Sequence, residues 1–142
     1  MIGDKIRLQQ VLVNLVKNAL KFSFNKPIKI VACFDHGDEL LKVHVRDKGR
    51  GIKEKDLSLL FNLFSKLEDD DNVNEEGIGM GLSICQKIVK SQKGKIECYS
   101  EGIGKGSTFS FSMKMSLPKR YEYEQSLTII DEVIGLEQSR ET

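Results

Sequence analysis

The sequence lacks three features that would indicate a special partner or environment: a strong net charge, a long apolar run and a close-spaced set of cysteines. A formal net charge of +1 gives no general attraction to nucleic acid or to a membrane surface. No apolar run approaches the roughly 20 residues of a transmembrane helix, and we expect no signal peptide before the first helical pattern. The 3 cysteines, Cys33, Cys85 and Cys98, form no metal-ligand pattern, and their odd number fits reduced, packed thiols in the cytoplasm.

What is present is the composition of an ordinary globular protein, with 142 residues of which 39% are hydrophobic and 30% charged. That length predicts one domain with a substantial core. Because a helical pattern begins almost at the first residue, we expect a fragment of a longer protein. The sequence becomes polar after Pro118, and residues 127–136 keep only a weak helical pattern. We therefore predict a folded domain at residues 1–117 and a polar tail or linker at residues 118–142.

Apolar residues recur at helical spacing in three segments, residues 5–22, 54–63 and 81–91. Asp4 is the expected N-cap of the first helix. Alternating apolar residues predict four strands, residues 28–34, 40–46, 95–100 and 107–115. Residues 65–79 have few apolar side chains and predict a mobile loop. Because the strands are grouped in hairpins, we expect an α+β fold, in which helices cover one face of a mixed β-sheet.

The first predicted helix carries amide and amine side chains opposite its apolar face, at Asn14, Lys17, Asn18 and Lys21. Their spacings of three and four place them on one side of the helix. Amide oxygens suit Mg²⁺, which takes its other ligands from water and phosphates, and lysines suit a polyphosphate. Such a stripe is, by itself, more often a solvated polar face. The wide apolar arc of this helix instead favours a buried helix whose polar stripe faces a cavity.

Glycines cluster in three places, within residues 47–51, 77–82 and 104–109. In the first cluster, glycines let the backbone approach a flat ligand, and Asp47 can accept a hydrogen bond from an exocyclic amine such as that of adenine. An ordinary strand-ending turn is the alternative for this cluster. The second cluster opens a predicted helix, where free backbone amides and the helix dipole favour an anion. The third predicts a hairpin turn, and neither the second nor the third has the Lys-Ser/Thr ending of a phosphate loop.

Taken in order, these segments resemble the catalytic ATP-binding domain of sensor histidine kinases, in the GHKL or Bergerat-fold ATPase superfamily. The resemblance extends from residue 3 to about residue 115. Its motifs are the helix start, the asparagine box, the first glycine box, the phenylalanine box and the second and third glycine boxes, at residues 7–12, 14–23, 47–52, 60–66, 77–82 and 104–109. The resemblance implies the α/β sandwich of that superfamily, ATP and Mg²⁺ as cofactors, and protein-histidine kinase activity.

At the phosphate side of the site, the resemblance implies that Asn18, with Asn14, holds Mg²⁺ against the phosphates. Lys17 and Lys21 would face the phosphates, and Lys66 would reach the γ-phosphate. Asn14, Lys17 and Lys66 are therefore the expected catalytic residues.

At the adenine side, the resemblance places Phe22 near the base and makes Asp47 the acceptor for the adenine amine, with Thr108 assisting through water. The other expected nucleotide-binding positions are glycines and apolar residues of the first two glycine boxes, namely Gly49, Gly51, Ile52, Gly77, Gly79, Met80, Gly81 and Leu82. Residues 65–80 would form a lid that nucleotide orders.

Two departures from the superfamily refine the predicted activity. Asn14 occupies the position at which chaperone-type and mismatch-repair ATPases carry a glutamate general base, so phosphoryl transfer is favoured over hydrolysis. The chain also lacks the acceptor histidine of a dimerisation hairpin and the aspartate-bearing pattern of a receiver domain.

Since the chain lacks both, the resemblance implies that the γ-phosphate goes to a histidine on the dimerisation helices of a homodimeric parent kinase, with a response-regulator receiver domain downstream. A catalytically silent, nucleotide-sensing module is the alternative. We expect neither nucleic acid nor a membrane to contact this segment, and we expect it in the cytoplasm. Whether the parent protein is membrane-bound stays open.

Overall fold

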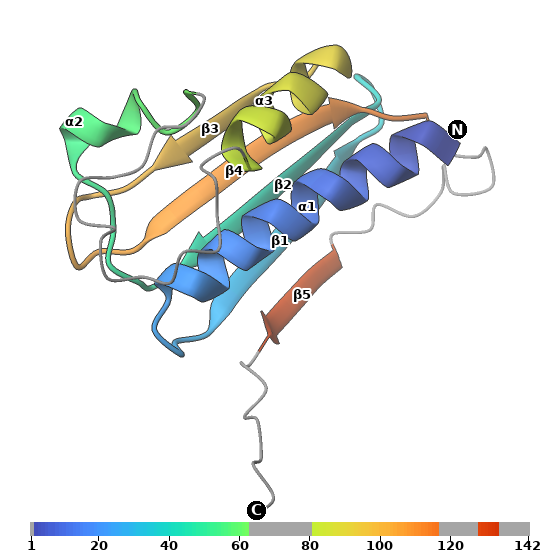
Figure 1. Cartoon of the computed structure of the whole chain (residues 1–142). Coiled ribbons are helices and arrows are strands. Elements are labelled where there is room, and N and C mark those ends of the chain that lie inside the picture. Colours follow the sequence, from blue (N-terminus) through green and yellow to red (C-terminus); the bar gives the residue numbers. More distant parts are fainter. Residues whose placement is uncertain (1, 63–80, 117–127, 134–142) are drawn as a thin grey trace, which may run out of the picture.

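The computed structural model describes residues 2–62, 81–116 and 128–133. Within these residues there are three helices, α1 (Ile2–Phe22), α2 (Glu54–Leu57) and α3 (Gly81–Ser91). The strands described are β1 (Ile28–Asp35), β2 (Leu40–Asp47), β3 (Ile96–Tyr99), β4 (Ser107–Lys114) and β5 (Thr128–Val133). Figure 1 shows α1 and α3 lying side by side across one sheet.

The strands form one sheet in the order β3-β4-β2-β1-β5. The described pairings are all antiparallel, where the sequence suggested a mixed sheet. Strands β1 and β2, and strands β3 and β4, are consecutive in the chain and pair as hairpins. The other two pairs, β2 with β4 and β1 with β5, join strands that are distant in the sequence and run in opposite directions. The register places Asp47 at the end of β2 directly opposite Ser107 at the start of β4. The predicted α+β fold is confirmed, and this register brings the ends of two loops together.

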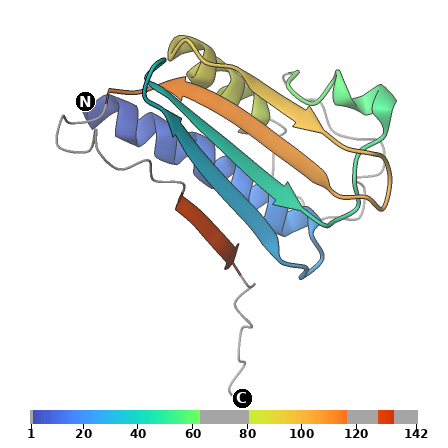
Figure 2. The ribbon, with the colours of Figure 1, turned by 180° about the vertical axis from the view of Figure 1, so that it is seen from behind.

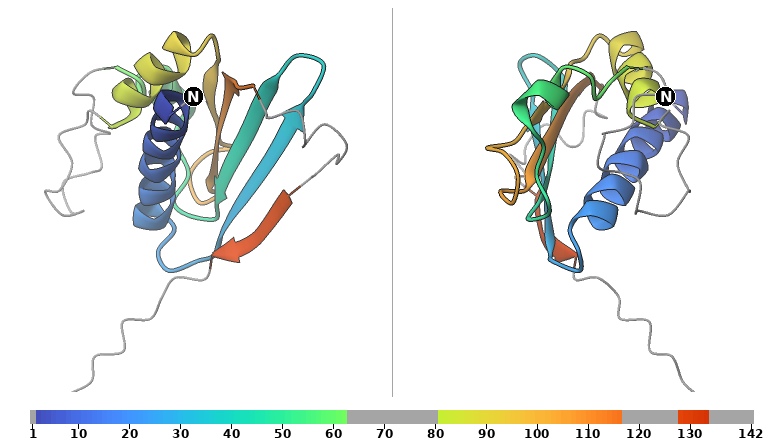
Figure 3. Two further views of the ribbon diagram at one scale, coloured as in Figure 1. Left: turned by 90° about the vertical axis from the view of Figure 1, so that its right-hand side faces the viewer. Right: turned by 60° about the vertical axis from the view of Figure 1, so that its left-hand side comes forward.

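Two layers meet in one hydrophobic core. Alternate residues of the strands face the helices, and α1 and α3 each contribute an apolar stripe. The fully buried residues with the largest side chains include Val11, Leu15, Ile28, Val45, Cys85, Val89 and Met113. Seen from behind, the other face of the sheet carries none of the described helices (Figure 2). Edge-on views show the same two layers, with both long helices on one side (Figure 3). No helix in the described part of the chain has both the length and the apolar character needed to cross a bilayer.

Most predicted elements agree with the structure, and three predictions are wrong in detail. Helix α1 begins at Ile2, so Asp4 lies inside its first turn and is not an N-cap. The second predicted helix ends at Leu57 and not at residue 63, because the following residues form turns closed by hydrogen bonds from Leu59 N to Asp56 O and from Asn62 N to Leu59 O.

The third difference concerns residues 127–136, for which the sequence indicated a weak helix. Residues Thr128–Val133 instead form β5, which pairs with the outer edge of β1. The segment contains Ile129, Ile130 and Val133, and β-branched residues favour strands. The loop predicted at residues 65–79 lies outside the described residues.

Candidate functional site

The carboxylate of Asp47 lies at the end of β2 and is held on both sides. Asp47 is only 3% exposed. Its Oδ1 accepts a hydrogen bond from Gly49 N at 2.8 Å, and its Oδ2 accepts one from Ser107 Oγ at 2.5 Å. Each carboxylate oxygen has a further lone pair, so the group can still accept from a ligand. Its direction is fixed by the loop and by β4.

Cys98 on β3 lies near this carboxylate. Burial raises the pKa of its thiol to about 12, and the negative charge of Asp47 contributes to the same shift. The thiol therefore stays protonated and neutral near Asp47 at ordinary pH. Cys85 on α3 is also fully buried, and burial raises its pKa to about 11, partly offset by a side-chain hydrogen bond with Asn14.

The loop after β2 is packed between the end of α1 and the turn before β4. Gly49 lies so close to the carbonyl oxygen of Phe22 that a Cβ at this position would overlap it. Gly51 has a φ of 70° and leaves the same kind of space for the carbonyl oxygen of Gly102. Gly106 N then donates to Gly49 O at 3.1 Å. Glycine is needed at residues 49 and 51 because the neighbouring backbone occupies the place of a side chain.

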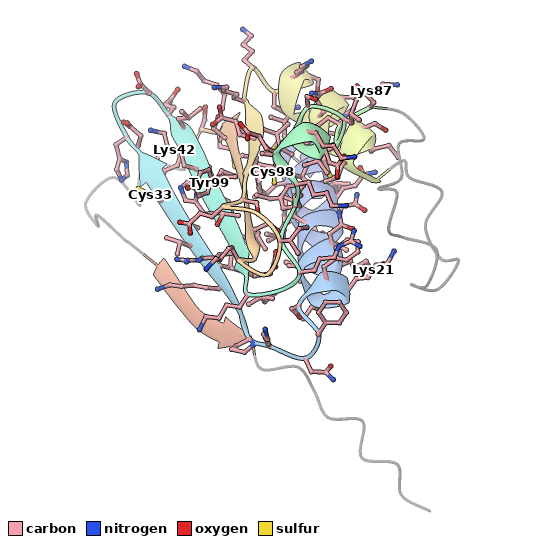
Figure 4. The ribbon with its side chains drawn as sticks, turned by 90° about the vertical axis from the view of Figure 1, so that its left-hand side faces the viewer. Lys21, Cys33, Lys42, Lys87, Cys98 and Tyr99 are labelled. Carbon is pink, nitrogen blue, oxygen red and sulfur yellow. The ribbon has the colours of Figure 1, made fainter. Side chains whose placement is uncertain are left out.

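Phe22 connects this loop to α1. Its carbonyl oxygen accepts a hydrogen bond from Arg50 N at 3.3 Å. Two cations lie over its ring, with Lys21 Nζ at 5.1 Å and Arg50 Cζ at 4.4 Å from the centroid. Such cation–π contacts are favourable, and they hold two positive side chains at this end of the helix. Figure 4 shows Lys21 on α1, well away from Lys42 and Cys33 on the strands.

The polar stripe of α1 meets the start of α3. Asn14 and Asn18 are half-buried, whereas Lys17 and Lys21 are exposed. A Cβ at Gly81, the first residue of α3, would lie 3.5 Å from Asn14 Oδ1. The N-terminus of α3 therefore lies beside the amide stripe, and the positive end of a helix dipole favours an anion.

Residues 3–117 match the family of histidine kinase-, DNA gyrase B- and HSP90-like ATPases. The chain belongs to this ATPase family. It is 39% identical over 111 residues to the adaptive-response sensory kinase SasA of Synechococcus elongatus, in a match covering 78% of this chain and 28% of SasA. It is also 39% identical over 119 residues to the signal transduction histidine-protein kinase BarA of Escherichia coli, covering 82% of this chain and 13% of BarA. The chain thus spans less than a third of either relative.

Solved structures of this ATPase family have the same fold. Full-length ShkA in complex with AMPPNP superposes with a TM-score of 0.65 at 26% identity, covering 79% of this chain and 22% of ShkA. The nucleotide-free catalytic domain of histidine kinase ThkA gives a TM-score of 0.63 at 30% identity, covering 78% of this chain and 68% of that domain. The predicted resemblance to catalytic domains of sensor histidine kinases is confirmed.

Within this ATPase fold, Thr108, which the sequence analysis expected to assist at the adenine through water, does not lie beside Asp47. Thr108 pairs with Arg46 on β2 and with Tyr99 on β3, so the alternation of strand residues places it on the opposite face of the sheet. The residue that reaches Asp47 is Ser107, which is 9% exposed and which the sequence analysis missed. The register that places Ser107 directly opposite Asp47 joins segments 60 residues apart, and neither segment alone indicates it.

The remaining predicted residues divide into two groups. Ile52 is 7% exposed and belongs to the core, against which half-buried Leu82 also packs. The other group lies outside the described residues and comprises Lys66, Gly77, Gly79 and Met80. The sequence analysis missed two residues of the loops near Asp47: Arg50, whose guanidinium lies over the Phe22 ring, and Ser100, whose Oγ accepts a hydrogen bond from Ile52 N at 3.0 Å.

Proposed function

We propose that this chain binds Mg²⁺-ATP and donates the γ-phosphate to a histidine on a dimerisation domain outside the chain. The observation that carries the proposal is the buried, doubly held carboxylate of Asp47 at the end of β2. Residues 1–117 would be the functional domain. Residues 118–142, which supply β5, would be a tail or linker toward further parts of the parent protein.

The adenine end of the proposed site consists of Asp47, Gly49, Gly51 and Ile52. Adenine presents an exocyclic amine that can donate to Asp47, whereas guanine presents a carbonyl oxygen that a carboxylate repels. The two glycines let the loop pack against the carbonyl oxygens of Phe22 and Gly102, which holds its backbone in place after Asp47, and Ile52 would offer an apolar contact to the base. This combination supports adenine as the preferred base.

The phosphate end consists of Asn14, Lys17, Asn18, Lys21 and Gly81. The residues fit a magnesium nucleotide, because neutral amide oxygens are suitable Mg²⁺ ligands and the N-terminus of α3, which lies beside Asn14, favours an anion. When bound, Mg²⁺ neutralises charge on the phosphates during phosphoryl transfer. The complex of its structural relative ShkA with AMPPNP, an ATP analogue, supports the same ligand class here.

Transfer to histidine is supported by the relatives BarA and ThkA, which are named histidine kinases. The chain's own contribution would be positioning and charge stabilisation, since little covalent chemistry is required of the protein. Asn14 and Lys17 would orient the phosphates, and Lys66 would complete the site. The dimerisation helices of a homodimeric cytoplasmic kinase would supply the acceptor, and a receiver domain would take the phosphoryl group onward.

The proposal is tested in two steps. Calorimetric titration of the full chain with ATP should show binding that strengthens when Mg²⁺ is added. Mixing the chain with a purified dimerisation hairpin that carries its histidine should then give an acid-labile phosphoryl group on the hairpin, but not on a hairpin whose histidine is replaced by alanine. Absence of magnesium-dependent ATP binding would refute the proposed site. Binding without transfer would refute the kinase activity and favour a silent nucleotide-sensing module.

A further inference from the structure

Ser100, which follows β3, joins two loops through a single hydroxyl group. Its Oγ accepts hydrogen bonds from Ile52 N at 3.0 Å and from Gly102 N at 3.3 Å. It donates to the carbonyl oxygen of Gly106 at 2.7 Å, with the carbonyl of Gly102 at 3.4 Å as the longer alternative. A serine hydroxyl has one hydrogen and two lone pairs, so these bonds use its full capacity.

The two loops that Ser100 joins form and support the adenine end. Gly104 N donates to Arg50 O at 2.6 Å, and Gly106 N donates to Gly49 O at 3.1 Å. These two backbone hydrogen bonds hold the loops together at residues 49 and 50 of the first loop. Ile52 lies further along the loop, and its amide is held by Ser100.

Asp47 and Ile52 are therefore fixed by different partners. Asp47 takes its direction from Gly49 and Ser107, whereas the backbone of Ile52 takes its position from Ser100. Adenine is rigid and planar, so its amine can reach the carboxylate only if Ile52 leaves the ring in the correct plane. Adenine binding therefore requires both the correct distance between Asp47 and Ile52 and the correct orientation of each side chain.

We propose that Ser100 is a positioning residue for adenine: its hydroxyl fixes Ile52 relative to Asp47 and so sets the geometry of the adenine end. This inference rests on the proposed function. Ser100 would not need to touch the base, because its hydrogen bonds are to the backbone of the two loops. It acts by tying the loop after β2 to the turn before β4.

The test compares Ser100→Ala with the wild-type chain by calorimetric titration. The substitution removes the acceptor for two amides and the donor to Gly106, so we expect ATP to bind about 5- to 20-fold more weakly. Because the defect lies at the adenine end, ADP should weaken by the same factor as ATP. The ratio of ATP affinities with and without Mg²⁺ should stay at its wild-type value, since the amides of α1 are untouched.

Two further variants make the result specific. Ser100→Thr keeps the hydroxyl and should restore the affinity to within about twofold of wild type. Ser110→Ala is the matched control, because it removes a hydroxyl that bonds His44 Nδ1 at 2.7 Å from β4, away from both loops. It should bind ATP like the wild type. If Ser100→Ala does not fold, Ser100→Cys keeps the side-chain size with weaker hydrogen bonds and should give a smaller loss of the same kind.

Three outcomes would overturn the inference. Ser100→Ala could lower the urea midpoint while the folded protein binds ATP at wild-type affinity, which would mean a role in stability alone. A loss that appears only with Mg²⁺ would move its effect to the phosphate end. A wild-type chain that binds no ATP would instead refute the proposed function, on which this inference depends.

Discussion

Replacing Asp47 with asparagine separates ligand recognition from the stability of the fold. Asparagine has nearly the same shape, and its Oδ1 can still accept from Gly49 N. The new Nδ2 would face Ser107, whose hydroxyl can reverse its role and accept, because a hydroxyl is both donor and acceptor. Both internal hydrogen bonds of Asp47 therefore have replacements. We expect Asp47→Asn to change the free energy of unfolding by less than ~1.5 kcal/mol.

The effect on the ligand should be much larger. An adenine amine would meet an amide N–H₂ donor in place of the carboxylate acceptor, and the lost hydrogen bond to a charged group contributes ~1.5–3 kcal/mol. That corresponds to ATP binding ~10- to 150-fold more weakly. The carbonyl oxygen of guanine could accept from the new N–H₂ group, so the preference for ATP over GTP should fall further than the ATP affinity alone indicates.

Calorimetric titration with ATP and GTP and urea unfolding measure these quantities on the same samples. Asp35→Asn is the matched control. Like Asp47, Asp35 accepts two hydrogen bonds, in its case from Gly37 N and Asp38 N to Oδ1, but it lies in the β1–β2 hairpin. It should leave both nucleotide affinities unchanged. A folded Asp47→Asn protein with wild-type affinity and wild-type base preference would refute the assignment of the adenine end.

The remaining predictions address the loop, the metal and the buried thiols. Gly51→Ala places a Cβ against the carbonyl of Gly102 at a φ of 70°, so we expect the free energy of unfolding to fall by at least ~1 kcal/mol in urea titrations, and an unchanged value would contradict the packing of the two loops. Asn18→Ala should remove most of the gain in ATP affinity that Mg²⁺ gives, while ATP binding without Mg²⁺ stays near wild type; equal magnesium dependence in both proteins would show that Asn18 is not a ligand. Because burial raises the pKa of Cys85 from 9.0 to about 11, the folded thiol stays protonated while the unfolded one ionises. The resulting stabilisation is complete below about pH 9 and is lost as the pH rises to about 11. Urea unfolding of the wild type and Cys85→Val across this range should show a smaller decline in the variant, and parallel declines would rule this out.

Much of the fold was predictable because each main element buries one side. Residues 5–22 and 81–91 carry apolar stripes at helical spacing, and they form α1 and α3. The same apolar spacing continues over residues 54–63, although α2 ends at Leu57. The spacing continues because Leu60 and Phe61, which lie in the turns after α2, also pack against the core. Strand β5 was missed for another reason: its pairing with β1 joins residues about 100 positions apart, and no local pattern reports such a contact.

The site was predictable only in part, because its geometry depends on register between distant segments. The asparagines of α1 and the glycines at residues 49 and 51 have side-chain requirements that appear in the sequence itself. Ser107 and Thr108 are adjacent and chemically alike, and only their alternation relative to β2 shows which one faces Asp47. Ser100 bonds to Ile52 across 48 residues, and a lone serine after a strand gives no local sign of that role.

Helix α1 links the two ends of the proposed site, which gives a last prediction. Phe22 contacts the loop after β2, and Asn14, which lies eight residues before Phe22 in the same helix, faces Gly81. With a helix rise of 1.5 Å per residue, these two contacts are ~12 Å apart along the axis of α1. Leu15 lies between them and is fully buried. Leu15→Val should cost ~1 kcal/mol of stability and, by letting α1 shift as a rigid body, should weaken ADP binding and reduce the magnesium dependence of ATP binding together. Variants at one end, such as Ser100→Ala or Asn18→Ala, should change only one of these quantities. If Leu15→Val lowers the urea midpoint and alters neither nucleotide measurement, the two ends are held independently of α1.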